Sequence, residues 1–319
     1  MRLADLLLTV DAQITAGSPD TEISGITNRS RDVAPGFLFV AWRGMEHDGH
    51  DFIPEALRRG ASAVVVERDI NMQPGVAVVR VADGRASLAR LVARFYGDPS
   101  HELRVIGITG TSGKTTTAFL TDAVFHQTGH RTGLIGTIWV KIGDRLEASD
   151  ATTPEASDLQ RIFAQMVQVQ TEYAVMEVSS HALELRRVDQ TRFTVGVFTN
   201  ISHEHLDFHK TFENYMKAKR KLFEQMASDS EAPSWAVINV DDPEGAKLAD
   251  ELTIPVVRFG LSPHADLHAS EIRVGPQGTS FVAQYAGTSV AMNLKLIGRV
   301  NVYNALAATG VALTQGLSL

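Results

Sequence analysis

The segment Val105–Thr117 constrains the fold of this chain more than any other. A β-branched run, VIGIT, leads into a turn of small residues, and Lys114-Thr115-Thr116 then opens a predicted helix. Gly110 and Gly113 give the turn the backbone freedom to curl, so that its N–H groups converge where the helix N-terminus favours negative charge. A strand, a glycine-rich loop and a helix in this order predict a nucleotide site at the edge of a parallel α/β sheet.

Within this loop, two side chains have the chemistry that a nucleotide needs. Lys114 would neutralise the outer phosphates, and the Thr115 hydroxyl would hold Mg²⁺. The match to the common pattern G-x-x-x-x-G-K-[ST] is imperfect, because Ile108 stands where that pattern begins with glycine. A glycine-rich turn with an exposed lysine is the structural alternative, and the strand–loop–helix context favours nucleotide binding over it.

Composition narrows the class of protein. The 319 residues, 44% hydrophobic and 21% charged, are enough for two globular domains. The net charge of −7 does not favour nucleic-acid binding, which needs a basic surface. There is no membrane-spanning apolar run, no signal-peptide pattern at the start and no cysteine for disulfides or thiolate metal sites. We therefore expect a cytoplasmic protein with no nucleic-acid or membrane partner, and the sequence identifies no protein partner.

Turn residues at Gly97–Ser100 divide the chain into two predicted α/β domains, residues 1–98 and 99–319. Strands alternate with helices before the turn, and strand–loop–helix units of a mostly parallel sheet follow it. An antiparallel element of three or four strands is expected over Leu267–Leu296. The predicted strands are Gly36–Trp42, Ala63–Glu67, Val76–Val81, Arg104–Thr109, Tyr173–Val178, Val195–Asn200 and Trp235–Asn239. The predicted helices are Ile53–Arg59, Arg85–Tyr96, Lys114–Thr128, Phe212–Met226, Asp242–Glu251 and Gly298–Gln315.

Polar residues follow two of the predicted strands, where open α/β sheets place their ligands. Glu177 ends one strand and His205 follows the next, so both could complete Mg²⁺ coordination begun by Thr115, although Mg²⁺ usually takes oxygen ligands. A helix-capping glutamate and histidines that satisfy local hydrogen bonds are an equal alternative. Zinc is less favoured, because no second cluster adds ligands to His203, His205 and His209.

Two later segments have both a structural and a functional interpretation. Lys217, Lys219, Arg220 and Lys221 lie on one predicted helix, and by themselves they indicate a solvated basic face. Asn301 and Asn304 lie three residues apart and so share a helix face. Asn301 could be a helix N-cap, or the amides could contact a purine edge.

Short motifs in a fixed order run along essentially the whole chain. They are Ser30-Arg31, Gly36–Ala41, Asp48–Phe52, Thr109–Thr116, Thr152-Thr153-Pro154, Met176–Ala182, Thr199–Ser202, His205–Asp207, Tyr215 with Lys219, and Gly298 with Asn301 and Asn304. Together they resemble the Mur ligases of bacterial cell-wall synthesis, whose phosphate loop T-G-T-x-G-K-T-T explains the departure from the common pattern. Within the family, the string EVSSHA favours the members that add the third amino acid to UDP-N-acetylmuramoyl-L-alanyl-D-glutamate.

The resemblance implies a role for each matching residue. The residues implied to hold ATP are Gly110, Thr111, Ser112, Gly113, Lys114, Thr115 and Thr116, with Asn301 and Asn304 near the adenine. Those implied to hold Mg²⁺ are Thr115, Glu177, His205 and Lys219, the last as a carbamylated lysine. Those implied in catalysis are Lys114, Glu177, His205 and Lys219. Those implied to contact the uridine nucleotide are Asn28, Ser30, Met45, Glu46 and His47, and those for the muramoyl-peptide are Thr152, Thr153, Ser179 and Arg187.

The resemblance also implies a UDP-binding first domain, an ATP-binding second domain and a reaction. An ATP-dependent ligase of this kind adds meso-diaminopimelate or L-lysine to the UDP-muramoyl-dipeptide through an acyl phosphate. Two departures are His203-Glu204, where the family often has Arg-Asp, and Leu185, where some members place a substrate-binding glutamine. The family's third domain, which binds the incoming amino acid, is expected to be absent, so ligation by this chain alone would be weak. A non-catalytic module that binds ATP and a UDP-sugar, and another carboxylate ligase such as a folylpolyglutamate synthase, are the alternatives.

Overall fold

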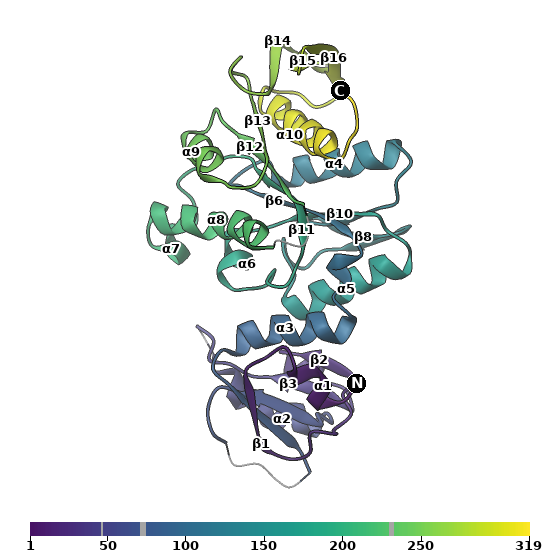
Figure 1. Ribbon diagram of the computed structural model, residues 1–319, viewed down its shortest axis with the longest axis vertical. Coiled ribbons are helices and arrows are strands. Elements are labelled where there is room, and N and C mark those ends of the chain that lie inside the picture. The colour runs from purple at the N-terminus through teal and green to yellow at the C-terminus, as the bar shows by residue number, and fades with distance from the viewer. Residues whose placement is uncertain (46, 71–74, 230–232) are drawn as a thin grey trace. The chain divides into compact units, whose positions relative to one another are not determined.

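The computed structural model describes residues 1–45, 47–70, 75–229 and 233–319 (Figure 1). Within it, the chain forms two compact units, each assembled from segments that are separate in the sequence. The first contains Met1–Pro99, Pro154–Ala164 and Leu185–Gln190, and the second contains Ser100–Thr153, Gln165–Glu184 and Thr191–Leu319.

The first unit is built on a five-stranded sheet in the order β1-β5-β4-β3-β2. Strands β2 to β5 are parallel, and β1 joins β5 antiparallel at one edge. The strands are apolar and buried, as expected for a parallel sheet covered by helices. Their bounds are Ala12–Ala16 (β1), Gly25–Thr27 (β2), Phe37–Val40 (β3), Ala63–Val66 (β4) and Ala77–Val81 (β5); the helices are Leu3–Leu7 (α1), Ile53–Arg58 (α2) and Gly84–Tyr96 (α3).

The second unit is built on an eleven-stranded sheet in the order β16-β15-β14-β13-β12-β11-β6-β10-β7-β8-β9. The strands from β14 to β7 in this order run parallel, and antiparallel hairpins extend both edges. The central strands are Arg104–Thr109 (β6), Tyr173–Glu177 (β10), Phe193–Phe198 (β11) and Trp235–Asn239 (β12). The outer strands are Thr132–Ile135 (β7), Trp139–Ile142 (β8), Arg145–Ala148 (β9), Val256–Gly260 (β13), Leu267–Gly275 (β14), Gly278–Tyr285 (β15) and Thr288–Leu294 (β16).

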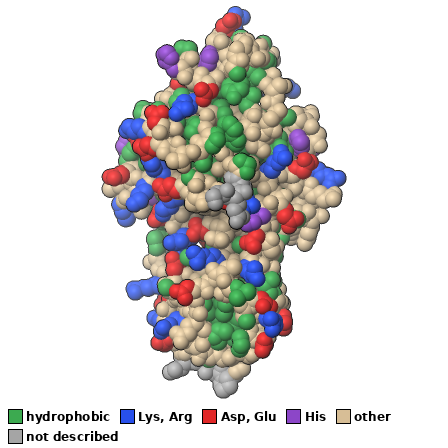
Figure 2. Space-filling view, in the orientation of Figure 1, with side chains coloured by type: hydrophobic (Ala, Val, Ile, Leu, Met, Phe, Trp, Pro, Cys, Tyr) green, Lys and Arg blue, Asp and Glu red, His purple; other side chains and the backbone are tan. Residues whose placement is uncertain are grey.

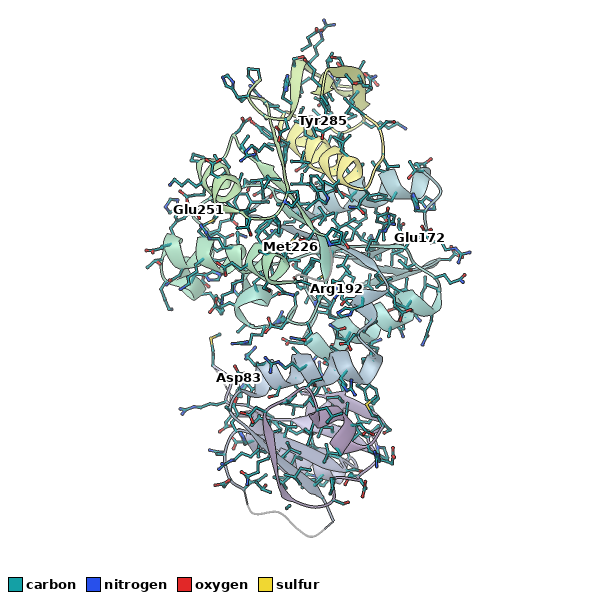
Figure 3. The ribbon with its side chains drawn as sticks, in the orientation of Figure 1. Asp83, Glu172, Arg192, Met226, Glu251 and Tyr285 are labelled. Atoms are coloured by element: carbon teal, nitrogen blue, oxygen red, sulfur yellow. The ribbon has the colours of Figure 1, made fainter. Side chains whose placement is uncertain are left out.

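Helices cover both faces of this sheet, with α4 and α10 on one face and α8 on the other (Figure 1). Alternate residues of each strand pack against the helices on opposite faces of this sheet, because successive side chains of a strand point to opposite faces. Where α8 crosses β11, Gly196 allows a close approach, because an added Cβ there would lie 2.6 Å from the Met226 sulfur. Figure 3 labels Met226 on α8. The helices of this unit are Lys114–Gln127 (α4), Ser180–Glu184 (α6), Leu206–His209 (α7), Phe212–Ser228 (α8), Pro243–Glu251 (α9) and Val300–Thr314 (α10). Helix α5, Ala156–Gln168, belongs to the first unit up to Ala164 and to the second from Gln165.

The α/β class and the mostly parallel sheets predicted from the sequence are confirmed. Predicted strands Arg104–Thr109 and Trp235–Asn239 have the observed bounds, and the antiparallel element over Leu267–Leu296 has three strands. The prediction lacked the β8–β9 hairpin, because β9 is exposed along its whole length and has no hydrophobic alternation. It also lacked α5, although apolar residues recur there at helical spacing.

Charged side chains of both signs are interspersed on the face of the protein that Figure 2 shows. Among the described residues, there is no helix of sufficient length and apolar character to span a bilayer.

We predict that Leu306→Ala strongly destabilises the second unit. Leu306 on α10 is fully buried in the core between that helix and the sheet, so truncation leaves a cavity that costs about 2–5 kcal/mol. Leu146→Ala is the matched control, because Leu146 lies on the exposed edge strand β9 and its loss should cost within about 0.5 kcal/mol. Urea unfolding of both variants measures the difference, and equal midpoints would contradict this core assignment.

Candidate functional site

The phosphate loop lies between β6 and α4, as the sequence predicts. Strand β6 ends at Thr109 and α4 begins at Lys114. Gly110 has φ +147° and Gly113 has φ +86°, both in the region that favours glycine. An added Cβ at Gly110 would overlap the Thr199 hydroxyl, and one at Gly113 would overlap the Asn304 amide oxygen. Backbone conformation and close packing therefore both require glycine at these two positions.

The residues that follow β11 hold the loop in place. Asn200 accepts a hydrogen bond from the Ser112 backbone N–H through Oδ1 (3.0 Å) and donates one to the Ser112 carbonyl through Nδ2 (3.0 Å). The Thr199 hydroxyl donates to the same carbonyl (2.7 Å). The Thr111 hydroxyl accepts from the backbone N–H of Ser202 (3.0 Å). The loop is thus preorganised by a neighbouring strand end, which the Thr199–Ser202 motif supplies.

Two lysine ammonium groups meet at one carbonyl of this loop. Lys114 Nζ donates to the carbonyls of Gly110 and Thr111, each at 2.9 Å. Lys219 of α8 donates to the same Gly110 carbonyl at 2.8 Å, and this residue is only 1% exposed. The solvated-face interpretation of the basic helix therefore applies to the exposed Lys217 and is wrong for Lys219.

Burial and like charge act together on these lysines. Burial lowers the pKa of Lys219 well below its ordinary value, and the charge of Lys114 lowers it further, against a smaller opposing effect of Glu204. Burial also lowers the pKa of Lys114, while the carboxylates of Glu177 and Glu204 act in the opposite direction. Of the two lysines, Lys219 is therefore the one whose surroundings lower its pKa further.

Glu177 is a fully buried carboxylate at the end of β10. Its Oε2 accepts hydrogen bonds from the hydroxyls of Thr115 (2.9 Å) and Thr137 (3.2 Å), and its Oε1 accepts from the Thr137 backbone N–H (2.7 Å). Gly136 leaves the room for this approach, since an added Cβ would lie 2.5 Å from Oε1. Sequence analysis missed Thr137, and a Gly-Thr pair directly after a strand was the only signal. The helix-capping alternative for Glu177 does not describe these contacts.

The donors next to the phosphate loop suit a hard cation. The Thr115 hydroxyl and the Glu177 carboxylate already touch, and oxygen ligands of this kind are the ones that Mg²⁺ prefers. Within the described ranges, no group of three or more histidines and carboxylates is arranged to hold a metal by itself. A magnesium ion at this point would therefore depend on oxygens from the nucleotide as well as on the protein, as magnesium sites commonly do.

His205 lies in a cluster of aromatic rings beside this site. Its ring centroid is 5.0 Å from that of His181 and 5.9 Å from that of Tyr215. His205 has φ +56°, a strained value for a non-glycine residue of the sort that functional sites often hold. Tyr215 connects the cluster to the loop, because its hydroxyl and that of Thr111 lie within hydrogen-bond distance (3.1 Å).

Asn301 and Asn304 share one face of α10, as their spacing predicts. Asn304 Nδ2 donates to Asn301 Oδ1 (3.1 Å), and Asn301 Nδ2 donates to the Ile297 carbonyl (3.1 Å). The helix begins at Val300, so Asn301 lies inside it and the N-cap alternative is wrong. Asn304 is close to Gly113, which brings this amide pair to the end of the phosphate loop.

Thr152, Thr153 and Ser179 gather around the strand that carries Glu177. The Thr153 hydroxyl donates to the Glu177 backbone carbonyl (2.9 Å) and accepts from the Ser179 backbone N–H (3.1 Å). Thr152 lies on the other side, where its hydroxyl is 3.1 Å from that of Thr137. These candidates for the peptide end of a substrate are therefore adjacent to the carboxylate and the loop.

The first unit contains the candidates for a uridine nucleotide. Ser30 donates to Glu55 (2.6 Å), which helps to lower the pKa of that carboxyl, and Asn28 Oδ1 is a buried acceptor with no partner among the described residues. Met45 is 75% exposed and the His47 ring meets Phe52 edge-on at 6.4 Å. Glu46 lies outside the described residues.

Arg187, also in the first unit, forms an ion pair with Glu155 (2.7 Å). A second guanidinium, that of Arg85, lies 5.0 Å from the Trp42 ring centre and 3.5 Å from the carbonyl oxygen of Leu185, the residue that departs from the family pattern. Burial lowers the pKa of Arg85, and the charge of Arg187 lowers it further, while Glu155 opposes both. Asp83 and Glu67 also act on Arg85 in the same direction as Glu155, so both arginines lie among carboxylates of this unit.

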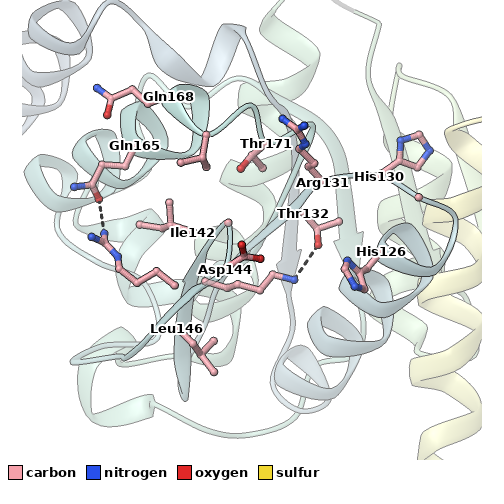
Figure 4. A pocket seen from close by; sticks show the side chains of 15 residues that line it. His126, His130, Arg131, Thr132, Ile142, Asp144, Leu146, Gln165, Gln168 and Thr171 are labelled. Carbon is pink, nitrogen blue, oxygen red and sulfur yellow. Dashed lines mark hydrogen bonds between the residues drawn. The ribbon is translucent and has the colours of Figure 1, made fainter.

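A separate pocket of about 1100 Å³ lies beside the β8–β9 hairpin (Figure 4). It has basic residues in its wall, but they already have partners. Lys141 binds Asp122 at 2.5 Å and Thr132 at 2.8 Å, and Arg145 binds Gln165 at 3.2 Å. None of the residues singled out from the sequence lines it.

Comparison with known families agrees with this geometry. Residues 108–312, more than half of the chain, match the Mur ligase middle domain, and residues 22–96 match the catalytic domain of the Mur ligase family. The chain belongs to the Mur ligase family. Its phosphate loop, its two lysines and the Glu177 carboxylate all lie inside the matched middle domain.

Among curated Mur ligases, the chain is similar to enzymes named UDP-N-acetylmuramoyl-L-alanyl-D-glutamate–2,6-diaminopimelate ligase. It is 39% identical over 317 residues to that of Syntrophomonas wolfei and 43% identical over 320 residues to that of Geobacter metallireducens. A solved structure with the same enzyme name superposes on the whole chain with a TM-score of 0.84 at 26% identity. The two curated matches include 99% and 100% of this chain. The chain spans only 64% and 63% of the length of those relatives, and 64% of the length of the solved chain.

We predict that Gly110→Ala destabilises the protein more than Gly129→Ala does. Both positions have positive φ, which costs a substituted residue about 1–3 kcal/mol. Only at Gly110 does the new methyl group also overlap a neighbour, Thr199, and that overpacking adds about 1–3 kcal/mol. Urea unfolding measures both variants; an equal loss of stability would show that the Gly110–Thr199 contact is not as tight as described.

Proposed function

We propose that this chain carries the nucleotide-binding parts of an ATP-dependent ligase that adds diaminopimelate to UDP-N-acetylmuramoyl-L-alanyl-D-glutamate. The observation that carries the proposal is the meeting of Lys114 and Lys219 at the Gly110 carbonyl, beside the Thr115–Glu177 pair. Two cations and a buried carboxylate at a phosphate loop suit a triphosphate with Mg²⁺. The names of the relatives supply the substrate and the diamino acid, and L-lysine is the alternative amine.

The proposed chemistry converts a carboxylate into a group that an amine can displace. The terminal carboxylate of the dipeptide attacks the γ-phosphorus of ATP, the bond to the β-phosphate oxygen breaks, and an acyl phosphate and ADP form. The amine then attacks the acyl carbon, loses a proton and displaces phosphate. Because the first step brings two anions together, Lys114 serves to offset their repulsion, and positioning in the loop supplies much of the remainder.

Mg²⁺, when bound, would neutralise charge on the phosphate oxygens. Thr115 and Glu177 are the residues that would hold it, because their oxygens are already in contact. His205 is a further candidate ligand from the resemblance. A phosphate loop with a buried glutamate and oxygen donors from a neighbouring turn supports this choice of cation over zinc.

Lys219 is proposed to act as a carbamate. Its neutral amine would attack CO₂, a C–N bond would form, and a proton would leave to give an anionic carbamate. The low pKa of Lys219 supports this step, because only the unprotonated amine is a nucleophile. The modification replaces a buried cation next to Lys114 with an anion, so it relieves the repulsion between them and adds an oxygen donor for Mg²⁺.

The first unit is proposed to bind the uridine nucleotide and the second to bind ATP. The buried Asn28 oxygen, Ser30 and the exposed side chains of Met45 and His47 support the first assignment, and Arg187 would meet an anionic part of the muramoyl-peptide. Thr152, Thr153 and Ser179 lie next to Glu177 and are proposed to contact the peptide whose carboxylate reacts. The cytoplasm, where such precursors are made, is the proposed location.

A non-catalytic module that binds ATP and a UDP-sugar is the second candidate. Such a module would bind the same ligands as the ligase but would catalyse no reaction. Incubation with ATP, the UDP-muramoyl-dipeptide and diaminopimelate distinguishes the two candidates, because ADP and phosphate form only if the chain is a ligase. A folylpolyglutamate synthase is less well supported, because the first unit matches the Mur ligase family.

We predict that Lys114→Ala weakens ATP binding by roughly 10–150-fold, the loss expected when a hydrogen bond to a charged group worth about 1.5–3 kcal/mol is removed. The ammonium group lies on the phosphate loop and has no equivalent there if Lys219 is modified. Calorimetric titration with ATP and Mg²⁺ measures the change, with the exposed Lys217→Ala as control. ATP affinity that survives in Lys114→Ala would contradict the loop assignment.

We predict that Lys219 takes up ¹³CO₂. The unmodified chain and Lys217→Ala should each show a carbamate ¹³C resonance, whereas Lys219→Ala should lack it, because only the buried Lys219 has a strongly lowered pKa on α8. Acetate or formate should partly restore Mg²⁺-dependent ATP binding to Lys219→Ala by filling the space with a carboxylate. Identical spectra from Lys219→Ala and the unmodified chain would remove the carbamate hypothesis.

A further inference from the structure

His209 is a buried histidine that the proposed chemistry does not use. It ends α7, is 5% exposed, and its Nε2 lies 2.9 Å from the Ser180 hydroxyl. Ser180 is itself only 2% exposed. A serine and a histidine at this distance can form a nucleophilic pair, but a hydroxyl closed off from solvent cannot reach a substrate. The Ser180–His209 hydrogen bond can therefore affect the site only through the segments that it joins.

Those elements carry the proposed catalytic residues. Ser180 begins α6, three residues after Glu177 on the turn that follows β10. His209 itself lies on the short helix that starts after His205. Its ring packs on Tyr215 of α8 with the ring centroids 5.1 Å apart, and Lys219 lies one helical turn further along α8. The imidazole on α7 thus contacts two further segments, and each of the three segments contributes a side chain to the site.

The contacts continue to the phosphate loop. The Tyr215 hydroxyl is 3.1 Å from that of Thr111, and the Lys219 ammonium lies 4.5 Å from the centre of the Tyr215 ring. The backbone carbonyl of His209 also accepts a hydrogen bond from Asn214 Nδ2 (3.1 Å), which fixes the start of α8 against the end of α7. A shift of the His209 ring would therefore move Tyr215 and change the spacing between Lys219 and the loop.

We propose that His209 is a positioning residue whose imidazole, hydrogen-bonded to Ser180 and packed on Tyr215, sets the distance between the Glu177 turn and the Tyr215–Lys219 face of α8. The proposal rests on the proposed function, since it assigns His209 to the arrangement that receives Mg²⁺ and ATP. It concerns a residue that touches neither ligand and acts through Ser180 and Tyr215.

The test compares the full 319-residue chain with three variants. His209→Gln keeps a side chain that can hydrogen-bond to Ser180, Ser180→Ala removes the partner, and His209→Phe removes the hydrogen bond but keeps a ring. His101→Gln is the matched control, because His101 is an exposed histidine of the same unit. Calorimetric titration with ATP in excess Mg²⁺ is done at about pH 8 for every variant.

We expect Ser180→Ala and His209→Phe to bind ATP about 2–10-fold more weakly than the unmodified chain, the effect of one neutral hydrogen bond. His209→Gln, which can keep the hydrogen bond, and the control His101→Gln should bind ATP as tightly as the unmodified chain.

Two failures are distinguishable. If the unmodified chain binds no ATP at about pH 8, the proposed function is wrong and the positioning role falls with it. If it binds ATP but His209→Phe binds ATP as tightly, or His209→Gln binds it as weakly as His209→Phe, the proposed function stands and the role of the His209 hydrogen bond is overturned. A role confined to folding would lower the unfolding midpoint of Ser180→Ala without changing its ATP affinity, and that result would also overturn the proposal.

Discussion

The convergence of Lys114 and Lys219 on the Gly110 carbonyl is the interaction on which the rest of the site depends. Two ammonium groups in a buried position repel each other and lose hydration, and both effects lower the pKa of Lys219. The arrangement becomes favourable when an anion is present or when Lys219 loses its charge. A triphosphate meets the first condition and a carbamate on Lys219 meets the second. The repulsion between the two lysines therefore underlies both the proposed ATP binding and the proposed carbamylation.

The sheet topology places the other parts of the site around these two lysines. In the order β11-β6-β10, the phosphate loop follows the central strand and has the ends of its two parallel neighbours on either side. The end of β11 supplies Thr199 and Asn200, which hold the loop, and the end of β10 supplies Glu177, which reaches Thr115. Parallel strands bring their carboxyl ends to one edge, and this is where open α/β sheets bind ligands.

Membership in the Mur ligase family gives this geometry a chemical context. The proposed ligase must bring a carboxylate to a triphosphate, and a site with paired cations, a buried carboxylate and a preorganised loop is suited to that task. His209 supports the proposed reacting groups indirectly, because it connects the turn of Glu177 with the helix of Lys219 through Ser180 and Tyr215. The site is therefore as much a set of fixed spacings between segments as a set of side chains.

The sequence by itself determined the α/β class, the limits of β6 and the start of α4, and the glycines of the loop. These are local properties: hydrophobic period, turn chemistry and propensity act over a few residues. It did not determine that Lys219 is buried while Lys217 on the same helix is exposed, that Thr137 binds Glu177, or that His209 meets Ser180. Those contacts join residues 29 to 109 positions apart, or depend on which face of a helix the sheet covers, so only tertiary packing decides them.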